Sequence, residues 1–160
     1  MTVSVNFVPE VKLSGAIDAV DVAGLVKTIR RAQIELGEEI VVVGDSPRAR
    51  LAADLAGIAG ASCVRLVEPP ALDEAPERSA DVVIYAPDEA RWLSQAMRLT
   101  RDLGRVLLLG PVGAVDFDRY PDLHQRSIRL IRARPPDESS PQTTEFVQHL
   151  TRSGHLHWGA

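Results

Sequence analysis

The sequence of 160 residues has one cysteine, Cys63, and only two lysines, Lys12 and Lys27. A single cysteine excludes an intrachain disulfide and any metal site built from several thiolates. The apolar neighbours of Cys63 in SCVRLV predict a small buried side chain rather than a nucleophile. Because lysine is nearly absent, arginine carries almost all of the positive charge.

Long apolar runs and blocks of like charge are also missing. No apolar segment reaches membrane-spanning length, and the N-terminus has no basic region followed by an apolar stretch. We therefore expect a cytoplasmic protein without a membrane partner. The formal net charge is −4 and the two signs are interspersed, so we expect no nucleic-acid partner.

What is present is an alternation of strand-like and helix-like segments. Strands are predicted at 2–8, 39–43, 62–67, 81–86, 105–110 and 127–133, and helices at 17–34, 47–59, 87–102 and 142–153. Apolar strands separated by helices predict an α/β fold, doubly wound, with a mostly parallel sheet covered on both faces. We expect a single Rossmann-like domain over 1–160, with an N-terminal extension at 1–36, a core at 37–135 and a C-terminal helix and tail at 136–160.

The segment 41–61, VVVGDSPRARLAADLAGIAGA, has the pattern of a strand, a tight turn and a helix. In a dinucleotide-binding turn, one glycine makes the turn, a second admits the pyrophosphate and a third allows close helix packing. Gly44 meets the first requirement, but Ser46 and Ala49 occupy the other two positions. Ala49 still permits close packing, whereas Ser46 places a side chain where a phosphate needs bare backbone.

The order and spacing of several segments resemble a known family. GEEIVVVGDSP, LAADLAGIAGASCVRLVE, ADVVIYAP, AMRLTRDLGRVLLLGPVG and DLHQRSIRLIRAR, all within 37–135, are similar to the cofactor-binding domain of medium-chain dehydrogenases/reductases. These are the zinc-type alcohol dehydrogenases and their relatives. TTEFVQHLTRSGHL also resembles the late helix of that domain, so the similarity covers most of the chain.

Two further departures from the family accompany the altered turn. About 36 residues precede the first core strand, so we expect the separate catalytic domain, with its zinc ligands, to be absent. The connection at 69–80 is also too short for the helix and strand that the family inserts after the second strand, so we expect the fold to be shortened there. No metal site is predicted, because His155 and His157 lack a third ligand.

The resemblance implies cofactor-binding positions at Gly44, Ser46, Arg48, Glu68, Gly110 and Gly113. Glu68 follows Gly44 by 24 residues, close to the distance at which an acidic residue meets the ribose hydroxyls. Its carboxylate would repel a 2′-phosphate, so NAD would be preferred to NADP. The charge of Asp45 within the turn argues against any dinucleotide. We therefore predict no cofactor, with NAD as the alternative.

Polar residues follow several of the predicted strands. Asp45, Glu68, Tyr85 and Asp88 would meet at the carboxyl edge of the sheet, where open α/β sheets bind ligands. Such groups are candidates for general acid/base catalysis if burial raises the pKa of a carboxyl group. The alternative is that these loop ends are polar because they are solvated, and that Asp88 simply favours the helix dipole.

Three functions fit these observations. The first is a stand-alone domain without redox activity that binds a small molecule at this edge and catalyses a cyclisation, isomerisation or elimination. The second is an NAD-dependent oxidoreductase subunit that needs a catalytic domain from a partner. The third is a non-catalytic interaction protein. In each case we expect a homodimer, formed through SIRLIRA or the terminal HLHWGA.

Overall fold

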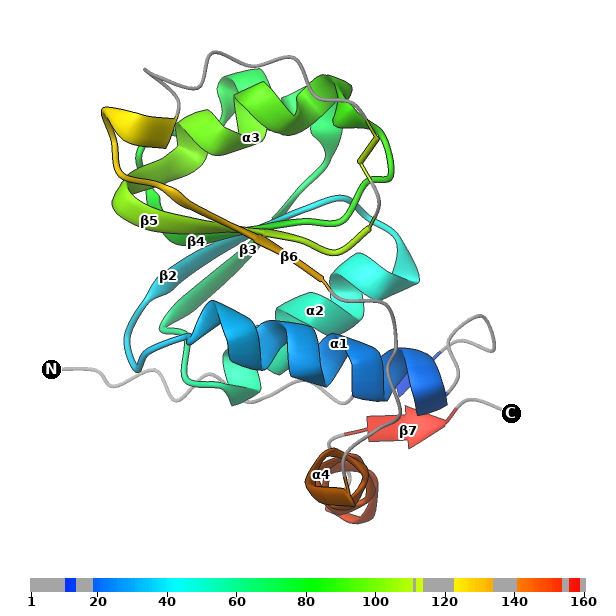
Figure 1. Ribbon diagram of the computed structural model, residues 1–160. Coiled ribbons are helices and arrows are strands. Elements are labelled where there is room, and N and C mark those ends of the chain that lie inside the picture. Colours follow the sequence, from blue (N-terminus) through cyan, green and yellow to red (C-terminus); the bar gives the residue numbers. More distant parts are fainter. Residues whose placement is uncertain are drawn as a thin grey trace, which may run out of the picture.

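The computed structural model describes residues 11–13, 19–110, 112–113, 123–133, 141–153 and 156–158. Its centre is a parallel sheet in the order β3-β2-β4-β5-β6, built from β2 (Glu39–Val43), β3 (Cys63–Val67), β4 (Ala80–Tyr85), β5 (Thr100–Leu108) and β6 (Arg129–Arg132). In Figure 1, α3 (Leu93–Leu99) lies on one face of the sheet, and α1 (Ala19–Ala32) and α2 (Pro47–Ile58) lie on the other. The predicted doubly wound, Rossmann-like α/β fold is confirmed.

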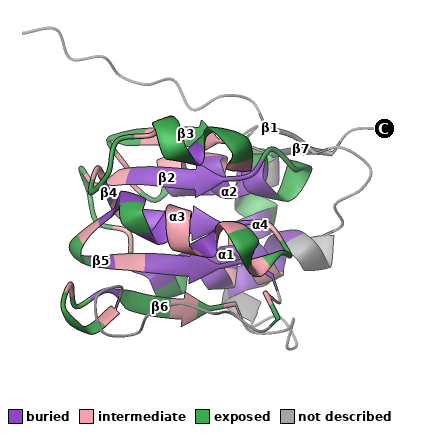
Figure 2. Cartoon of the chain, turned by 90° about the horizontal axis from the view of Figure 1, so that it is seen from above, coloured by how far each residue is buried: buried purple, intermediate pink, exposed green. Residues whose placement is uncertain are grey.

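Alternation along the central strands explains why both faces need helices. Ile40 and Val42 of β2 pack in the core cluster under α1 and α2, whereas Val41 and Val43 pack in the cluster under α3. All four side chains are buried, as a strand between two helical layers requires. Figure 2 shows the same pattern across the sheet, with buried residues on the central strands and exposed ones on β3 and β6.

The sheet is shortened after its second strand, as predicted. In the described part of the chain, β3 is an edge strand, and the 3-10 turn η1 (Pro69–Glu74) leads from it directly into β4. Cys63 is therefore exposed, and Leu66 keeps 48% of its surface accessible. The prediction of a buried Cys63 is wrong, because apolar neighbours bury a strand residue only where another strand and a helix cover it.

The predicted helix at 87–102 is wrong at both ends. The chain instead forms the 3-10 turn η2 (Ala90–Trp92), then α3, and enters β5 already at Thr100. Ala80 pairs with Thr100 and Val82 with Arg105, so β5 carries a bulge between these two pairs. Within the bulge Leu103 has a φ of +65° and Asp81 accepts hydrogen bonds from Arg101 at 2.9 and 3.0 Å. Helical spacing of apolar residues does not reveal such a local irregularity.

The ends of the chain form a second, smaller sheet. β1 (Val11–Leu13) pairs in parallel with β7 (Leu156–Trp158), which follows α4 (Pro141–Arg152). In Figure 1, α4 and β7 lie beyond α1 on the side away from the sheet. The strand predicted at 2–8 lies outside the described residues. None of the described helices is long and apolar enough to cross a membrane.

The bulge of β5 leaves no space for a side chain at Gly104. A Cβ at this position would lie 2.8 Å from the carbonyl oxygen of Arg101 and 2.9 Å from that of Asp81. Backbone atoms cannot move aside cheaply, so we expect Gly104→Ala to lower the free energy of unfolding by about 2 kcal/mol in urea denaturation.

Gly57 in α2 is the matched control, because a Cβ there meets nothing within 4 Å. Gly57→Ala should raise the free energy of unfolding by roughly 0.5–1 kcal/mol, since alanine is the better helix former. Equal effects of the two substitutions would contradict the described packing of the bulge.

Candidate functional site

The strand order reverses between β2 and β4. From β2 the chain first places β3 on one side and then β4 on the other. Open α/β sheets bind their ligands outside the carboxyl ends of the strands at such a switch point. The residues that follow β2, β4 and β5 are therefore the first place to look for a functional site.

The turn after β2 depends on glycine. Gly44 has a φ of +118°, a backbone conformation that a residue with a side chain adopts only under strain. A Cβ here would also lie 3.4 Å from that of Ala86, which follows β4, so the two strand ends approach closely. The predicted role of Gly44 as the residue that makes the turn agrees with this backbone.

Ser46 caps α2. Its Oγ accepts a hydrogen bond from the backbone N–H of Ala49 at 3.2 Å, and Pro47 begins the helix. One of the N–H groups that would otherwise face a ligand is thus already used by the chain itself. Asp45 is exposed beside it, and its carbonyl oxygen accepts a hydrogen bond of 3.2 Å from Nε of Arg50.

Three of the predicted residues come together. A Cβ at Gly110, just after β5, would lie 2.3 Å from Oδ1 of Asp88 and 4.0 Å from Nη1 of Arg48. Asp88 follows β4 and Arg48 belongs to the first turn of α2, so this small site joins segments that follow three strands. Both charged side chains are exposed, and neither forms an ion pair or hydrogen bond with the described residues. We call Arg48, Asp88 and Gly110 the switch-point site.

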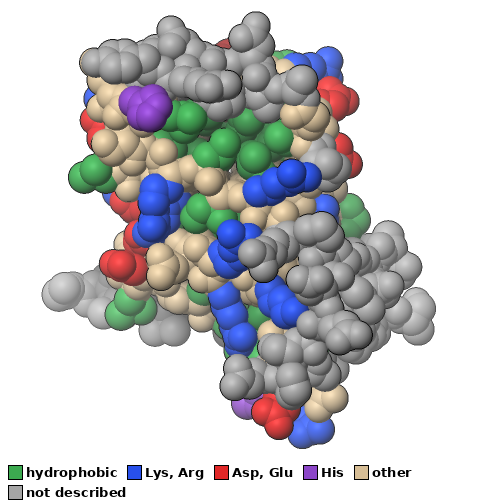
Figure 3. Space-filling view, viewed as in Figure 1, with side chains coloured by type: hydrophobic (Ala, Val, Ile, Leu, Met, Phe, Trp, Pro, Cys, Tyr) green, Lys and Arg blue, Asp and Glu red, His purple; other side chains and the backbone are tan. Residues whose placement is uncertain are grey.

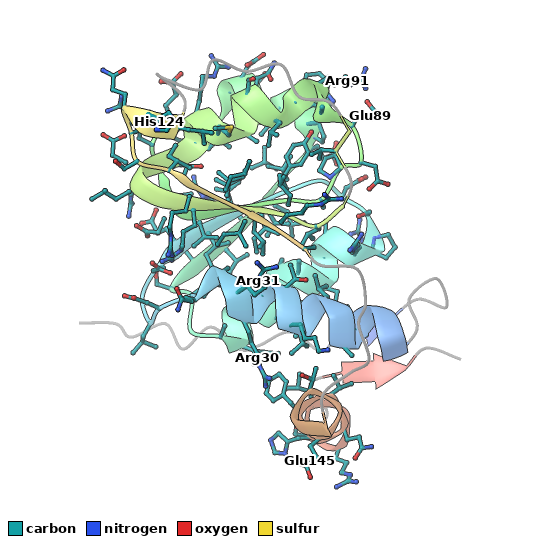
Figure 4. The ribbon with its side chains drawn as sticks, viewed as in Figure 1. Arg30, Arg31, Glu89, Arg91, His124 and Glu145 are labelled. Atoms are coloured by element: carbon teal, nitrogen blue, oxygen red, sulfur yellow. The ribbon has the colours of Figure 1, made fainter. Side chains whose placement is uncertain are left out.

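Tyr85 does not join this site. Its side chain is fully buried in the core under α3, and its hydroxyl donates a hydrogen bond to the backbone carbonyl of Glu89. Burial raises the pKa of Tyr85 above its ordinary value. Glu89 itself forms an exposed ion pair of 2.7 Å with Arg91, and both are labelled beside α3 in Figure 4.

The other two predicted positions stand apart. Glu68 is exposed after β3, and its carbonyl oxygen accepts the N–H of Ala71 at 2.9 Å. Gly113 is exposed, has a φ of +62° and would meet nothing within 4 Å if it carried a Cβ. Among the described residues, no group of three or more His, Cys, Asp or Glu side chains is arranged to hold a metal ion. His155 lies outside the described residues.

Asp54 is an unusual group that the sequence analysis missed. It lies in the middle of α2, and desolvation by burial raises its pKa from 3.8 to about 6. No sequence motif marks this position, because a single aspartate in an amphipathic helix is normally solvated. Only the packing around α2 shows that this carboxyl group is partly removed from water.

Comparison with known proteins places the fold. No family model and no curated protein sequence matches this chain. Among solved structures, a protein assigned as a zinc-binding dehydrogenase from Sinorhizobium meliloti 1021, bound to NADP, matches with 20% identity and a TM-score of 0.73, over 91% of this chain and 52% of that one. Benzyl alcohol dehydrogenase from Acinetobacter calcoaceticus matches with 13% identity and a TM-score of 0.71, over 89% and 49%.

A third match is alcohol dehydrogenase from Thermus sp. ATN1, with 20% identity and a TM-score of 0.67, over 85% of this chain and 47% of that one. The described chain thus spans about half the length of these dehydrogenases. At such low identities the likeness establishes a shared fold. The predicted alcohol-dehydrogenase-like fold is therefore confirmed, while activity has to be argued from the site.

The raised pKa of Asp54 predicts a pH-dependent stability. Because the folded pKa exceeds the unfolded value, the free energy of unfolding should fall as pH rises from about 4 to about 6 and stay reduced above that window. Asp54→Asn should stabilise the protein by about 1 kcal/mol at about pH 7.5, after allowance for solvent around this half-buried side chain. The gain should shrink towards zero at about pH 4, measured by urea denaturation at both values.

Glu74→Gln in the exposed end of η1 serves as the control for this measurement. This substitution should leave the stability unchanged at either pH. An Asp54→Asn variant that is equally stabilised at both pH values would show that charge is not the cause.

Proposed function

We propose that this chain is a small-molecule-binding domain that carries out no hydride transfer by itself. The observation that carries the proposal is the switch-point site, where Arg48 and Asp88 converge on Gly110 without pairing with other described residues. Exposed, unpaired charges of opposite sign at a topological switch point are suited to a ligand that satisfies both. We infer a small polar molecule with an anionic group for Arg48 and a hydrogen-bond donor for Asp88.

The start of α2 supports a ligand smaller than a dinucleotide. The hydroxyl of Ser46 already caps the helix, and the exposed, acidic Asp45 comes directly before this cap, at the helix end whose N–H groups a pyrophosphate would need. On the other side of β2, the edge strand β3 is followed only by η1 within the described residues. The adenine of a dinucleotide would have little wall to lie against.

Catalysis at this site would rest on Asp88. A carboxylate next to the bound donor can accept a proton, which is the step shared by cyclisations, isomerisations and eliminations. Tyr85 contributes no proton to this step, because its buried hydroxyl is held by the carbonyl of Glu89. Asp45 follows β2 and Glu68 follows β3, so both remain candidate charges at the same edge of the sheet, outside the switch-point site.

One observation favours a second function. Glu68 follows β3, the second strand of the core, which is where an acidic residue would meet the ribose hydroxyls of a dinucleotide. A solved structure with the same fold was determined with NADP bound. The chain would then be an NAD-dependent oxidoreductase subunit that obtains its catalytic domain from a partner, and Glu68 would select NAD over NADP.

Ligand binding distinguishes these two functions. We expect hydroxy- or amino-carboxylates in a thermal-shift panel to raise the melting temperature, while NADH and NADPH leave it unchanged up to about 1 mM. Arg48→Ala and Asp88→Asn should each abolish the shift given by the best ligand, because each removes one of the two charges that hold it.

Arg50→Ala is the matched control, since Arg50 is an exposed arginine of the same helix turn that contacts the carbonyl of Asp45 instead. This variant should keep the shift. Micromolar binding of NADH, checked by calorimetry, would overturn the first function and favour the second.

We also propose that the chain forms a homodimer through β6. The N–H of Ala133 donates a hydrogen bond to the carbonyl oxygen of Leu108 in β5. Because the hydrogen-bonding groups of successive strand residues point to opposite sides, the N–H and C=O groups of Leu130 and Arg132 point away from β5. The outer carbonyl of Arg132 already accepts a hydrogen bond of 2.8 Å from Arg31. An antiparallel pairing centred on Leu130, which is 38% exposed, would keep the arginines of β6 from facing one another.

Because proline lacks a backbone N–H, proline substitutions test whether the outer edge of β6 forms the dimer. Leu130→Pro removes an N–H that faces away from β5, so it should convert a dimer into a monomer of 17.4 kDa in light scattering while the protein stays folded. Ile131→Pro should instead unfold β6, because that N–H faces β5. A wild-type protein that is monomeric at all concentrations would contradict the proposed dimer.

A further inference from the structure

A hollow lies between α1, α2 and α4, on the side of the sheet opposite α3. It encloses a volume of about 370 Å³, within the range of roughly 300–1,000 Å³ that small-molecule pockets occupy. None of the residues of the switch-point site lines it. We call it the α1–α2–α4 pocket.

Most of its lining is apolar. The three helices and the segment just after α1 contribute Val26, Ile29, Ile34, Leu55, Ile58 and Phe146. The three deepest of these side chains belong to the buried core, but Ile34, Ile58 and Phe146 are only partly buried. Three large apolar side chains, one each from α2, α4 and the segment after α1, are thus only partly buried around one hollow, which favours an apolar occupant.

The polar side of the pocket is positively charged. Arg30 lines it and lies over the ring of Phe146, with its guanidinium carbon 5.0 Å from the ring centre. No acidic residue belongs to the lining, and Arg30 forms no ion pair within the described part of the chain. Figure 4 shows Arg30 projecting from α1 towards α4, while Glu145 points away on the far side of α4.

The helix dipole favours arginine in the last turn of a helix, so the presence of Arg30 there is not by itself evidence of a binding site. The neighbouring Arg31 provides the comparison. It turns towards the sheet and donates a hydrogen bond of 2.8 Å to the carbonyl of Arg132. Figure 3 shows arginine and lysine side chains gathered over this side of the molecule, where β6 and α1 lie. Only Arg30 of this pair is directed into the pocket.

Gln33 completes the polar side. It follows α1 with a φ of +49°, a conformation in which glycine is the easier residue at the end of a helix. Its backbone N–H donates to the carbonyl of Arg30 at 3.1 Å, and the residue lines the same pocket. Gln33 is therefore the second residue with a polar side chain, beside Arg30, in the lining of this pocket.

We propose that the α1–α2–α4 pocket binds a small amphipathic carboxylate. The apolar chain lies against the aliphatic and aromatic lining, the guanidinium of Arg30 pairs with the carboxylate, and the amide of Gln33 donates a second hydrogen bond to it. If each non-hydrogen group occupies roughly the 30 Å³ of a water molecule, a volume of about 370 Å³ has room for about twelve such groups. This is room enough for a carboxylate with a chain of about eight carbons.

Octanoate is the probe, and 1-octanol is the same chain without the charge. In titrations of the ¹⁵N-labelled full chain, octanoate should shift the amide resonances of α1 and α4 and saturate below about 1 mM. The alcohol should bind about tenfold more weakly. Arg30→Ala should weaken octanoate about tenfold, while Arg31→Ala, the matched control, should leave its affinity unchanged.

A variant that fills the pocket tests the binding location without changing any charge. Ala59 is exposed at the end of α2 and lines the pocket, so Ala59→Trp should fill the pocket and abolish binding of octanoate and 1-octanol while the fold is kept. The proposal is overturned if octanoate does not bind, if the alcohol binds equally well, or if Arg30→Ala and Arg31→Ala behave alike. These variants leave Arg48 and Asp88 intact, so the result does not depend on the switch-point site.

Discussion

The left-handed backbone of Gly44 is the constraint on which the rest of the molecule depends. At a φ of +118° the chain leaves β2 and begins α2 at Pro47, after a turn of only three residues. The same turn brings the end of β2 against Ala86 after β4. Because the helix begins so close to the strand, its first turn carries Arg48 to Gly110, and Ser46 can cap its N–H groups. A side chain at Gly44 would disturb all of these relations at once.

α2 links the two binding sites that we propose. Arg48 stands in its first turn and Ile58 at its last residue, and a helix of 12 residues is about 18 Å long. The switch-point site and the α1–α2–α4 pocket therefore lie at opposite ends of one rigid element. Asp54, with its raised pKa, lies between them on the same helix. The protonation of Asp54 thus acts on an element that both sites share.

Sequence patterns located the sheet closely. The expected strand at 39–43 coincides with β2, and those at 62–67 and 81–86 differ from β3 and β4 by one residue. Long apolar runs flanked by turn residues leave little choice to the backbone. The prediction of a helix at 87–102 was wrong at its C-terminal end. The helical spacing of apolar residues continues into a segment that forms a strand, because it pairs with β4 and because Gly104 fits closely against the backbone there. Pairing with a distant strand is a tertiary effect that overrides local spacing.

By itself, the sequence determined the fold class, the tight turn at Gly44 and the loss of the two further glycines, since each depends on residues close together in the chain. Only the tertiary structure decided which polar groups meet. It joined Arg48 and Asp88 at Gly110, buried the hydroxyl of Tyr85 and left Cys63 exposed on an edge strand. It also placed Arg30 beside an apolar pocket built by three helices. The burial and proximity of individual side chains arise from the packing of elements distant in the chain, so local patterns alone do not fix either.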